Sequence, residues 1–318
     1  MLFTICLIVL GFILLIKGAN WMVNGSTLLA KKYKISDLII GLTIVAFGTS
    51  APELVVNIIA SSNGQSDIVL GNVIGSNIFN LFAILGIVGI IYPIAVQSTM
   101  VRKEIPISLG ATLLFILLAV TPFLKKPELT RVDGIILLGV FGVFLFYIFT
   151  QMSGKEEHSV STAIPSSNKK IWFLIAIGLL GLILGGKLVV DNAVALATSF
   201  GVSKKMIGFT IIAVGTSLPE LVTSVVAAMK KNSDIAIGNI IGSNIFNILL
   251  VLSISIFIHP IEYQSNFTSS VYLLIGGTLF LLLAMYTGKK YKLDRWEALI
   301  LLIAFLIFDG YLIYQELS

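Results

Sequence analysis

Two stretches of this chain each occur twice, and the two copies of both are separated by the same 167 residues. The sequence IIGLTIVAFGTSAPEL at 39–54 returns as MIGFTIIAVGTSLPEL at 206–221, with 11 of 16 positions identical. The sequence GNVIGSNIFN at 71–80 returns as GNIIGSNIFN at 238–247, with 9 of 10 identical. Shared apolar composition alone does not produce such identity, so the chain contains an internal duplication.

Each copy of the first stretch carries one glutamate, Glu53 or Glu220, in an otherwise uncharged apolar sequence. An ionisable side chain in such a segment is costly in free energy, so its presence indicates a functional site. A duplication retained only for packing would not need two of these residues. We therefore favour a functional role for the repeat over a purely structural one.

The composition points to a membrane protein with many spans. The chain is 57% hydrophobic and 12% charged, whereas soluble domains have roughly 25% charged residues. The net charge of +5 comes from basic residues in short connections between apolar segments. They form no basic face interleaved with aromatic residues, so a nucleic-acid partner is not expected.

About 20 apolar residues cross a bilayer, and on this rule the chain has ten transmembrane helices. We therefore expect an all-α membrane protein with a first five-helix repeat at 1–150, a linker at 151–170 and a second repeat at 171–318. The ten expected spans are Leu2–Asn20, Leu38–Ala60, Ile68–Tyr92, Ile105–Pro122, Val132–Thr150, Ile171–Val190, Met206–Met229, Ile235–Ile258, Val271–Tyr286 and Trp296–Tyr314.

The basic residues also predict an orientation. Connections that follow odd-numbered spans contain fourteen Lys and Arg, and those that follow even-numbered spans contain five. The positive-inside rule then places the linker in the cytoplasm and both termini outside the cell membrane. Because each repeat has five spans, the second copy enters the membrane inverted. Transporters built in this way bind substrates near the midplane on interrupted helices, which we expect to be helices 2, 3, 7 and 8.

The GTSAPE motif combines a helix-breaking proline with oxygen-bearing side chains. Pro52 lacks an N–H and crowds the carbonyl four residues earlier, so nearby carbonyls are expected to lose helical partners. Thr49 and Ser50 share a helix face with Glu53. Carboxylate, hydroxyl and carbonyl oxygens are hard ligands that suit Ca²⁺ or Na⁺. In the second copy the corresponding residues are Pro219, Thr216, Ser217 and Glu220.

The second motif adds neutral oxygen ligands. Ser76 and Asn80 are spaced i,i+4, as are Ser243 and Asn247, so each pair shares a helix face. The GxxxG spacing in each copy favours close helix packing. For the other asparagines of the motif we expect interhelical hydrogen bonds rather than ion contact; these are Asn72, Asn77, Asn239 and Asn244.

The residue types narrow the function. The repeats contain no Cys or His, which disfavours a soft transition-metal site, and no His that could serve as the base of an enzyme. Two glutamates that face each other repel unless a cation or a proton lies between them. One Ca²⁺ or several Na⁺ would neutralise both glutamates. Because either set of ions would use the same two carboxylates, the site favours binding of one set at a time, which is what an antiporter requires. Ca²⁺/H⁺ antiport and a cation channel remain alternatives, and no cofactor is expected.

The paired motifs resemble the alpha repeats of the calcium/cation antiporter superfamily, and most closely its sodium/calcium exchanger branch in short prokaryotic form. The resemblance implies that Glu53 and Glu220 are essential carboxylates and that the chain exchanges Na⁺ for Ca²⁺. Asn80 and Asn247 match two central positions, of which the second is Asp in some members. It also implies carbonyl ligands at Ala46, Thr49, Ala213 and Thr216 and hydroxyl ligands at Ser50, Ser76, Ser217 and Ser243.

The resemblance further implies alternating access, in which the first and sixth spans slide across a core formed by the other eight. Glycines such as Gly11, Gly18, Gly178 and Gly185 fit sliding or close packing equally well. The linker at 151–170 is too short for a regulatory Ca²⁺-binding domain. The expected partners are therefore the transported Ca²⁺ and Na⁺ and the lipid bilayer, with no obligate protein partner.

Overall fold

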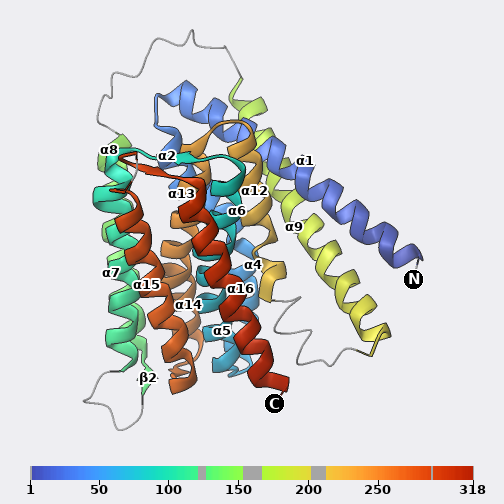
Figure 1. The fold of residues 1–318 in the computed structure, drawn as a ribbon, viewed down its shortest axis with the longest axis vertical. Helices are drawn as coiled ribbons and strands as arrows, with labels where there is room; N and C mark the ends of the chain where they lie inside the picture. Colours follow the sequence, from blue (N-terminus) through green and yellow to red (C-terminus); the bar gives the residue numbers. More distant parts are fainter. Residues whose placement is uncertain (1, 121–126, 153–166, 202–212, 288, 318) are drawn as a thin grey trace.

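The computed structural model describes residues 2–120, 127–152, 167–201, 213–287 and 289–317, which are helical almost throughout (Figure 1). Within these residues, seven helices are long and apolar enough to cross a membrane. An eighth candidate consists of Asp37–Thr49 and Ala51–Ser62, which are bent by 45° at the break between them.

The described elements up to residue 152 are eight α-helices, three π-helical segments and two short strands. They are α1 (Leu2–Tyr33), α2 (Asp37–Ile40), η1 (Gly41–Val45), α3 (Ala46–Thr49), α4 (Ala51–Ser62), α5 (Ser66–Ile78), η2 (Phe79–Ile84), α6 (Leu85–Ile91), β1 (Ile94–Ala95), η3 (Met100–Glu104), α7 (Ile105–Ala119), β2 (Glu128–Leu129) and α8 (Arg131–Met152).

The elements after residue 167 follow a similar order. They are α9 (Asn168–Ser199), α11 (Ala213–Thr216), α12 (Leu218–Met229), α13 (Ser233–Phe246), η5 (Asn247–Val251), α14 (Leu252–Ile258), β3 (Ile261–Glu262), the 3₁₀-helix η6 (Ser265–Phe267), α15 (Thr268–Ala284), β4 (Lys292–Leu293) and α16 (Arg295–Leu317).

Most of the predicted spans are present. For two of them, the structure describes only a part of the predicted length. Helices α7 and α12 have 15 and 12 residues, and the spans predicted there continue into residues 121–126 and 202–212, outside the described residues. The linker prediction likewise falls mostly on residues 153–166, which are not described.

The second and seventh predicted spans are interrupted, as expected, at Ser50 and Ser217. In each case the following proline lies in the first turn of a new helix, where its missing N–H costs no helical hydrogen bond. The expected interruption of the third and eighth spans is wrong. Ser66–Ile91 and Ser233–Ile258 are continuous helices, because they contain no proline, and each accommodates a π-helical segment instead.

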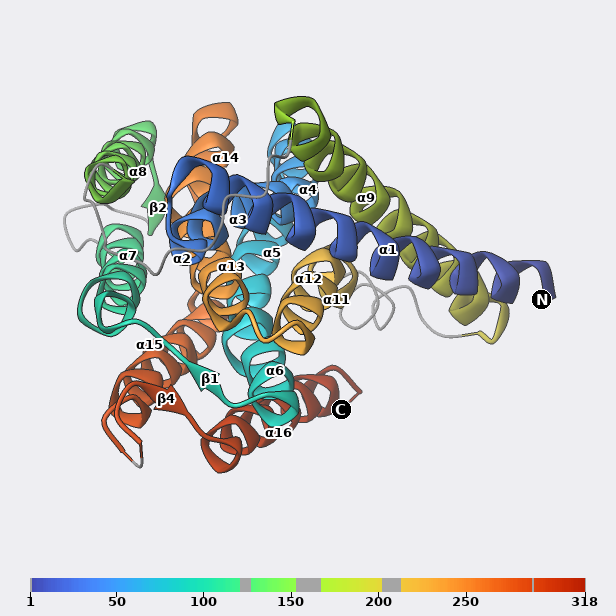
Figure 2. The same ribbon diagram turned by 90° about the horizontal axis from the view of Figure 1, so that it is seen from above.

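Helices α1 and α9 lie side by side and extend away from the remaining helices (Figures 1 and 2). Their backbones touch at glycines. A Cβ built on Gly11 would lie 2.9 Å from the Gly185 carbonyl oxygen, and one on Gly185 would lie 2.7 Å from that of Gly11. The pair Gly18 and Gly178 shows the same reciprocity at 2.8 and 2.9 Å. Close packing of these glycines is therefore confirmed.

The GxxxG glycines of the second copy also pack closely. A Cβ on Gly238 would lie 2.9 Å from the Leu38 carbonyl oxygen, and one on Gly242 would lie 2.7 Å from Ala46 Cβ. This contact seats α13 against α2, η1 and α3. Gly71 and Gly75 of the first copy make no comparably close contact with the described residues.

Two short antiparallel sheets join distant parts of the chain. Ile94 of β1 pairs with Leu293 of β4, and Leu129 of β2 pairs with Ile261 of β3. The strands β1 and β2 belong to the first half of the sequence, and their partners β4 and β3 belong to the second half. The two halves are consequently tied together at both ends of the bundle.

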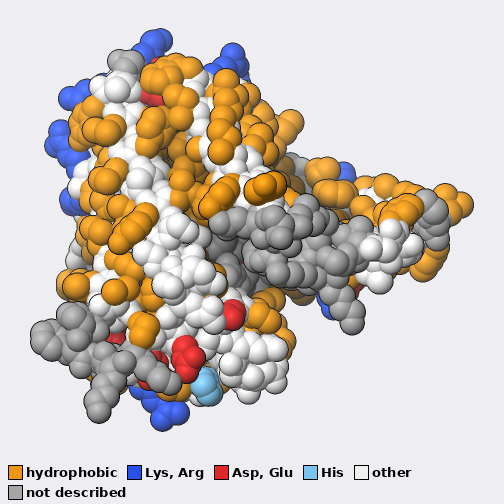
Figure 3. All heavy atoms as spheres, turned by 60° about the horizontal axis from the view of Figure 1, so that its bottom comes forward, with side chains coloured by type: hydrophobic (Ala, Val, Ile, Leu, Met, Phe, Trp, Pro, Cys, Tyr) orange, Lys and Arg blue, Asp and Glu red, His pale blue; other side chains and the backbone are white. Residues whose placement is uncertain are grey.

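The outer surface is largely apolar. Figure 3 shows hydrophobic side chains over much of one face, with Lys and Arg at its edges and several acidic side chains near its lower end. Large exposed side chains such as Phe146, Leu283 and Ile307 are about two-thirds exposed or more. An apolar surface of this extent is expected where lipid is the solvent.

The α1–α9 contact predicts the effect of adding a side chain there. Gly18→Leu would push a side chain into the backbone of Gly178, Gly181 and Leu182, and overpacking of this kind costs about 1–3 kcal/mol. We expect a lower melting temperature for the purified variant. Gly142→Leu in α8 is the control, because nothing lies within 4 Å of a Cβ there; equal melting temperatures of the two variants would contradict the contact.

Candidate ion-binding site

The breaks at Ser50 and Ser217 place the two repeated glutamates in equivalent positions. Glu53 lies in the first turn of α4 and Glu220 in the first turn of α12. Both side chains are at most 1% exposed. The positive end of a helix dipole stabilises a carboxylate at this position. Helix α4 packs against α5, and α12 packs against α13 (Figure 2).

Each carboxylate is held by a serine from the other copy of the motif. Ser50 Oγ donates to Glu220 Oε1 at 3.0 Å, and Ser217 Oγ donates to Glu53 Oε1 at 3.0 Å. The two carboxylates are also close enough to repel each other electrostatically. The two motifs, 167 residues apart in sequence, therefore form one site.

The serines of the second motif reach the same carboxylates. Ser76 Oγ in α5 lies 3.1 Å from Ser217 Oγ. Ser243 Oγ in α13 lies 3.4 Å from Glu220 Oε1. Both serines are fully buried. The structure thus brings together hydroxyl and carboxylate oxygens from four helical segments, and their role as ion ligands stays a prediction.

Four asparagines connect α5 and α13 by matching hydrogen bonds. Asn77 Nδ2 donates to the Asn244 carbonyl at 3.2 Å, and Asn244 Nδ2 donates to the Asn77 carbonyl at 3.3 Å. Asn80 Nδ2 donates to Asn244 Oδ1, and Asn247 Nδ2 donates to Asn77 Oδ1, both at 3.1 Å. The expected interhelical role of Asn77 and Asn244 is confirmed.

Asn72 and Asn239 link each glutamate backbone to the neighbouring helix. Asn72 Nδ2 donates to Asn57 Oδ1 at 2.8 Å and contacts the Glu53 carbonyl at 3.4 Å. In the other copy, Asn239 Nδ2 donates to Ser224 Oγ at 3.0 Å and contacts the Glu220 carbonyl at 3.4 Å.

The two threonines of the motifs complete these links. Thr49 Oγ1 donates to Asn239 Oδ1 at 3.0 Å, and Thr216 Oγ1 donates to Asn72 Oδ1 at 3.4 Å. Asn57 and Ser224 were not among the predicted site residues. Their i,i+4 spacing from the glutamates was the signal that could have identified them.

Four buried oxygens of the site accept no hydrogen bond from any described residue. They are Oε2 of each glutamate and Oδ1 of Asn80 and Asn247. Leaving a buried carboxylate or amide oxygen without a partner is costly. Hard oxygens of this kind are the ligands that Ca²⁺ and Na⁺ prefer. Each copy of the repeat contributes one carboxylate oxygen and one amide oxygen.

The asparagines with these free oxygens sit in the π-helical segments. Asn80 is the second residue of η2, and Asn247 is the first residue of η5. Short π-helical segments inside α-helices are often found at functional sites. Among the described residues, no group of three or more His, Cys, Asp or Glu side chains could hold a metal ion, and this site has only two such side chains, Glu53 and Glu220. Its chemistry rests on two carboxylates and neutral oxygens.

The alanines predicted as carbonyl ligands lie at the starts of the short helices before each break. Ala46 begins α3, and its carbonyl accepts the Ser50 N–H at 3.0 Å. The Ala46 carbonyl oxygen also lies 3.3 Å from Thr49 Oγ1, and an ion contact there stays a prediction. Ala213 is the first residue of α11, and a ligand role for its carbonyl also stays a prediction.

Two further buried carboxylates lie outside this site. Glu104 accepts a hydrogen bond from Tyr147. Glu297, in the first turn of α16, accepts from the backbone N–H of Asp294 at 2.7 Å and from Thr287, which is a helix-capping role.

Comparisons with known proteins give one consistent result. The sequence pattern of the sodium/calcium exchanger protein family matches residues 3–150 and 170–314. The chain is 38% identical to the putative antiporter CaxA of Alkalimonas amylolytica, over 99% of this chain and all of that protein. It is 31% identical to the sodium/calcium exchanger MaX1 of Methanosarcina acetivorans, over 97% of this chain and 98% of that protein.

A solved structure has the same fold. The structure of the sodium-calcium exchanger NCX_Mj soaked with 100 mM Na⁺ and 10 mM Sr²⁺ superimposes with a TM-score of 0.82. The two sequences are 31% identical, and the match covers 96% of each chain.

The asparagine bridge between α5 and α13 predicts a structural role that can be tested separately from ion binding. Asn77→Ala would remove a donor from the Asn244 carbonyl and leave the buried Asn247 Nδ2 without its partner, which costs about 1–3 kcal/mol for an unsatisfied buried group. We expect a clear fall in melting temperature in ion-free buffer. Asn63→Ala, at an exposed helix end, should change it little; an unchanged Asn77→Ala protein would contradict the bridge.

Proposed function

Because the chain belongs to the sodium/calcium exchanger protein family, we propose that it exchanges Na⁺ for Ca²⁺ and binds either ion set at Glu53 and Glu220. The family consists of ion exchangers, so the chain is a multi-pass membrane transporter of the cation/Ca²⁺ antiporter type and not an enzyme. Its ions are transported substrates rather than cofactors.

The four free oxygens at the centre of the bundle carry the proposal. Two carboxylate oxygens and two amide oxygens lie buried without hydrogen-bond donors from the described residues. A Ca²⁺ ion would neutralise both carboxylates at once, whereas Na⁺ ions would do so only in combination and would need the neutral oxygens as ligands. Both ion sets would use the same two glutamates, so they would exclude each other, as exchange requires.

The neutral ligands favour Na⁺ over H⁺ as the counter-ion. A proton needs only one of the carboxylate oxygens, whereas Na⁺ needs several oxygens around it. The buried hydroxyls of Ser50, Ser76, Ser217 and Ser243 supply such oxygens, as do Asn80 and Asn247. Ca²⁺/H⁺ antiport through the same two glutamates is the second candidate, and the transport experiment below separates the two.

We further propose that the chain consists of two inverted five-helix repeats, at 1–150 and 171–318, with ten spans in all. Pairs of contacts related by the 167-residue offset support this arrangement. The contact of Gly11 with Gly185 is matched by that of Gly178 with Gly18. The bond from Asn77 to the Asn244 carbonyl is matched by its converse. Reciprocal contacts of this kind are expected across a pseudo-two-fold axis.

In this arrangement α1 and α9 would be the mobile helices of an alternating-access cycle. Their backbones touch at Gly11, Gly18, Gly178 and Gly185, so the two helices would move as one body across the other helices. The linker would lie in the cytoplasm and both termini outside, as the distribution of basic residues predicts.

The decisive experiment measures ⁴⁵Ca²⁺ uptake into liposomes that contain the purified protein and are preloaded with Na⁺. Uptake should require an outward Na⁺ gradient and should not respond to a pH gradient alone. Uptake driven only by the pH gradient would establish the Ca²⁺/H⁺ antiporter instead. Uptake that needs neither gradient would indicate a channel.

The two glutamates should be indispensable for this uptake. Glu53→Gln and Glu220→Gln each remove one of the two charges that a divalent ion needs, while the amide keeps the size of the side chain. We expect each variant to fold and to lose Ca²⁺ uptake. Glu262→Gln, an exposed residue in β3, is the control and should retain uptake. Robust uptake by either site variant would refute the assignment.

A third charge at the site should change its ion dependence. Asn247→Asp replaces a buried amide whose Oδ1 has no described donor with a carboxylate. We expect a shifted Na⁺ dependence or pH profile of Ca²⁺ uptake, because the site would then carry three negative charges. Asn63→Asp, which adds the same charge at an exposed position, serves as the control. Identical profiles for Asn247→Asp and the unmodified protein would place Asn247 outside the site.

A further inference from the structure

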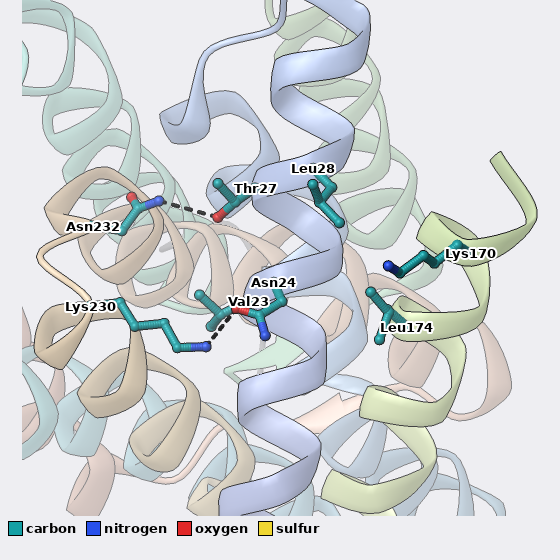
Figure 4. Close-up of a pocket in the computed structure, with 8 residues that line it drawn as sticks. All are labelled: Val23, Asn24, Thr27, Leu28, Lys170, Leu174, Lys230 and Asn232. Atoms are coloured by element: carbon teal, nitrogen blue, oxygen red, sulfur yellow. Dashed lines mark hydrogen bonds between the residues drawn. The ribbon is translucent and has the colours of Figure 1, made fainter. Parts of the chain in front are cut away.

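A second polar site lies where the α1–α9 pair meets the central helices, outside the repeated motifs. A pocket of about 490 Å³ opens between the last turns of α1, the start of α9 and the turn from α12 to α13. Its polar lining includes Asn24, Lys170, Lys230 and Asn232. Figure 4 shows Lys230 and Lys170 reaching toward α1 from opposite sides. The volume is typical of a pocket for a small molecule or a headgroup.

The pocket is positively charged. None of the described residues that line it is acidic. Lys230 Nζ donates to Asn24 Oδ1 at 2.8 Å and to the Asn20 carbonyl at 3.2 Å, so both of its partners are neutral oxygens. One N–H of this ammonium group is left for a ligand. The Lys170 ammonium has no partner among the described residues. Partial burial also lowers the pKa of Lys230, an effect that an anionic partner would offset.

The residues around the two lysines favour a lipid headgroup over a free inorganic anion as the ligand of this pocket. Val23, Leu28 and Leu174 give the pocket an apolar wall, which a free inorganic anion would not use. Trp172, two residues along α9 from both Lys170 and Leu174, is 50% exposed. Exposed tryptophan and lysine at the end of an apolar helix are typical of the headgroup level of a bilayer. Basic pockets between transmembrane helices bind acidic lipid headgroups.

We propose that this pocket binds the headgroup of an anionic phospholipid, with Lys230 and Lys170 compensating its charge from either side of α1 and an acyl chain along Leu28 and Leu174. Lys170 belongs to α9 of the mobile pair, and Lys230 belongs to the end of α12 in the central bundle. A bound headgroup would therefore link the two bodies and stabilise the arrangement in which α1 lies against α12. The binding of the lipid itself does not depend on the proposed exchange activity. Its effect on movement rests on the proposal that α1 and α9 are the mobile helices.

The test compares lipid retention and thermal stability without any transport assay. Protein is incorporated into phosphatidylcholine vesicles with or without phosphatidylglycerol, extracted in mild detergent and examined by native mass spectrometry. We expect the unmodified protein to retain phosphatidylglycerol and to melt at a higher temperature in its presence. Lys170→Gln/Lys230→Gln should reduce retention several-fold and remove the thermal shift, whereas Lys170→Arg/Lys230→Arg should keep both.

The control removes the same charge elsewhere. Lys169→Gln/Lys289→Gln changes two exposed lysines outside the pocket and should retain the lipid. Equal retention by the Lys170→Gln/Lys230→Gln variant and the unmodified protein would overturn the proposal, as would loss of retention in the control. If that double variant does not fold, Lys170→Gln alone decides the question. Inorganic phosphate added to phosphatidylcholine vesicles should give no thermal shift; a shift equal to that with phosphatidylglycerol would overturn a lipid as the ligand.

Discussion

The structure depends on the burial of two carboxylates in an apolar helical bundle. Glu53 and Glu220 are almost fully buried and close enough to repel each other, a costly arrangement in a membrane protein. The fold offsets part of this cost by giving one oxygen of each carboxylate a serine hydroxyl from the opposite motif. The other oxygen of each has no donor among the described residues, and a cation is the partner that would compensate for both charges.

Other features of the bundle position the two buried carboxylates and the groups around them. Proline in the first turn after each break starts a new helix whose N-terminus carries the glutamate, where the helix dipole favours negative charge. The reciprocal bonds of Asn77 and Asn244 hold α5 against α13. The π-helical segments then begin at the level of Asn80 and Asn247 and orient a free amide oxygen on each helix.

The α1–α9 pair is held by different kinds of contact from those that hold the central helices. The central helices are held by buried hydrogen bonds between side chains, which fix their relative positions. The pair is instead held to itself by glycine backbone contacts and to the centre in part by polar contacts at its edge, such as that of Lys230 with Asn24. Polar contacts of this kind can be exchanged for contacts with water, which would suit the movement proposed for the pair.

The sequence by itself determined the duplication, the membrane class and the residue types of the site, because repeated motifs, hydropathy and buried charge are all local properties of the chain. It also predicted the breaks at Ser50 and Ser217, since proline acts on its own helix. Only the tertiary structure decided that Ser50 bonds Glu220 rather than its own neighbour Glu53, and that Asn57 and Ser224 support the site. Those features arise from contacts between segments about 15 to 170 residues apart, which local patterns do not specify.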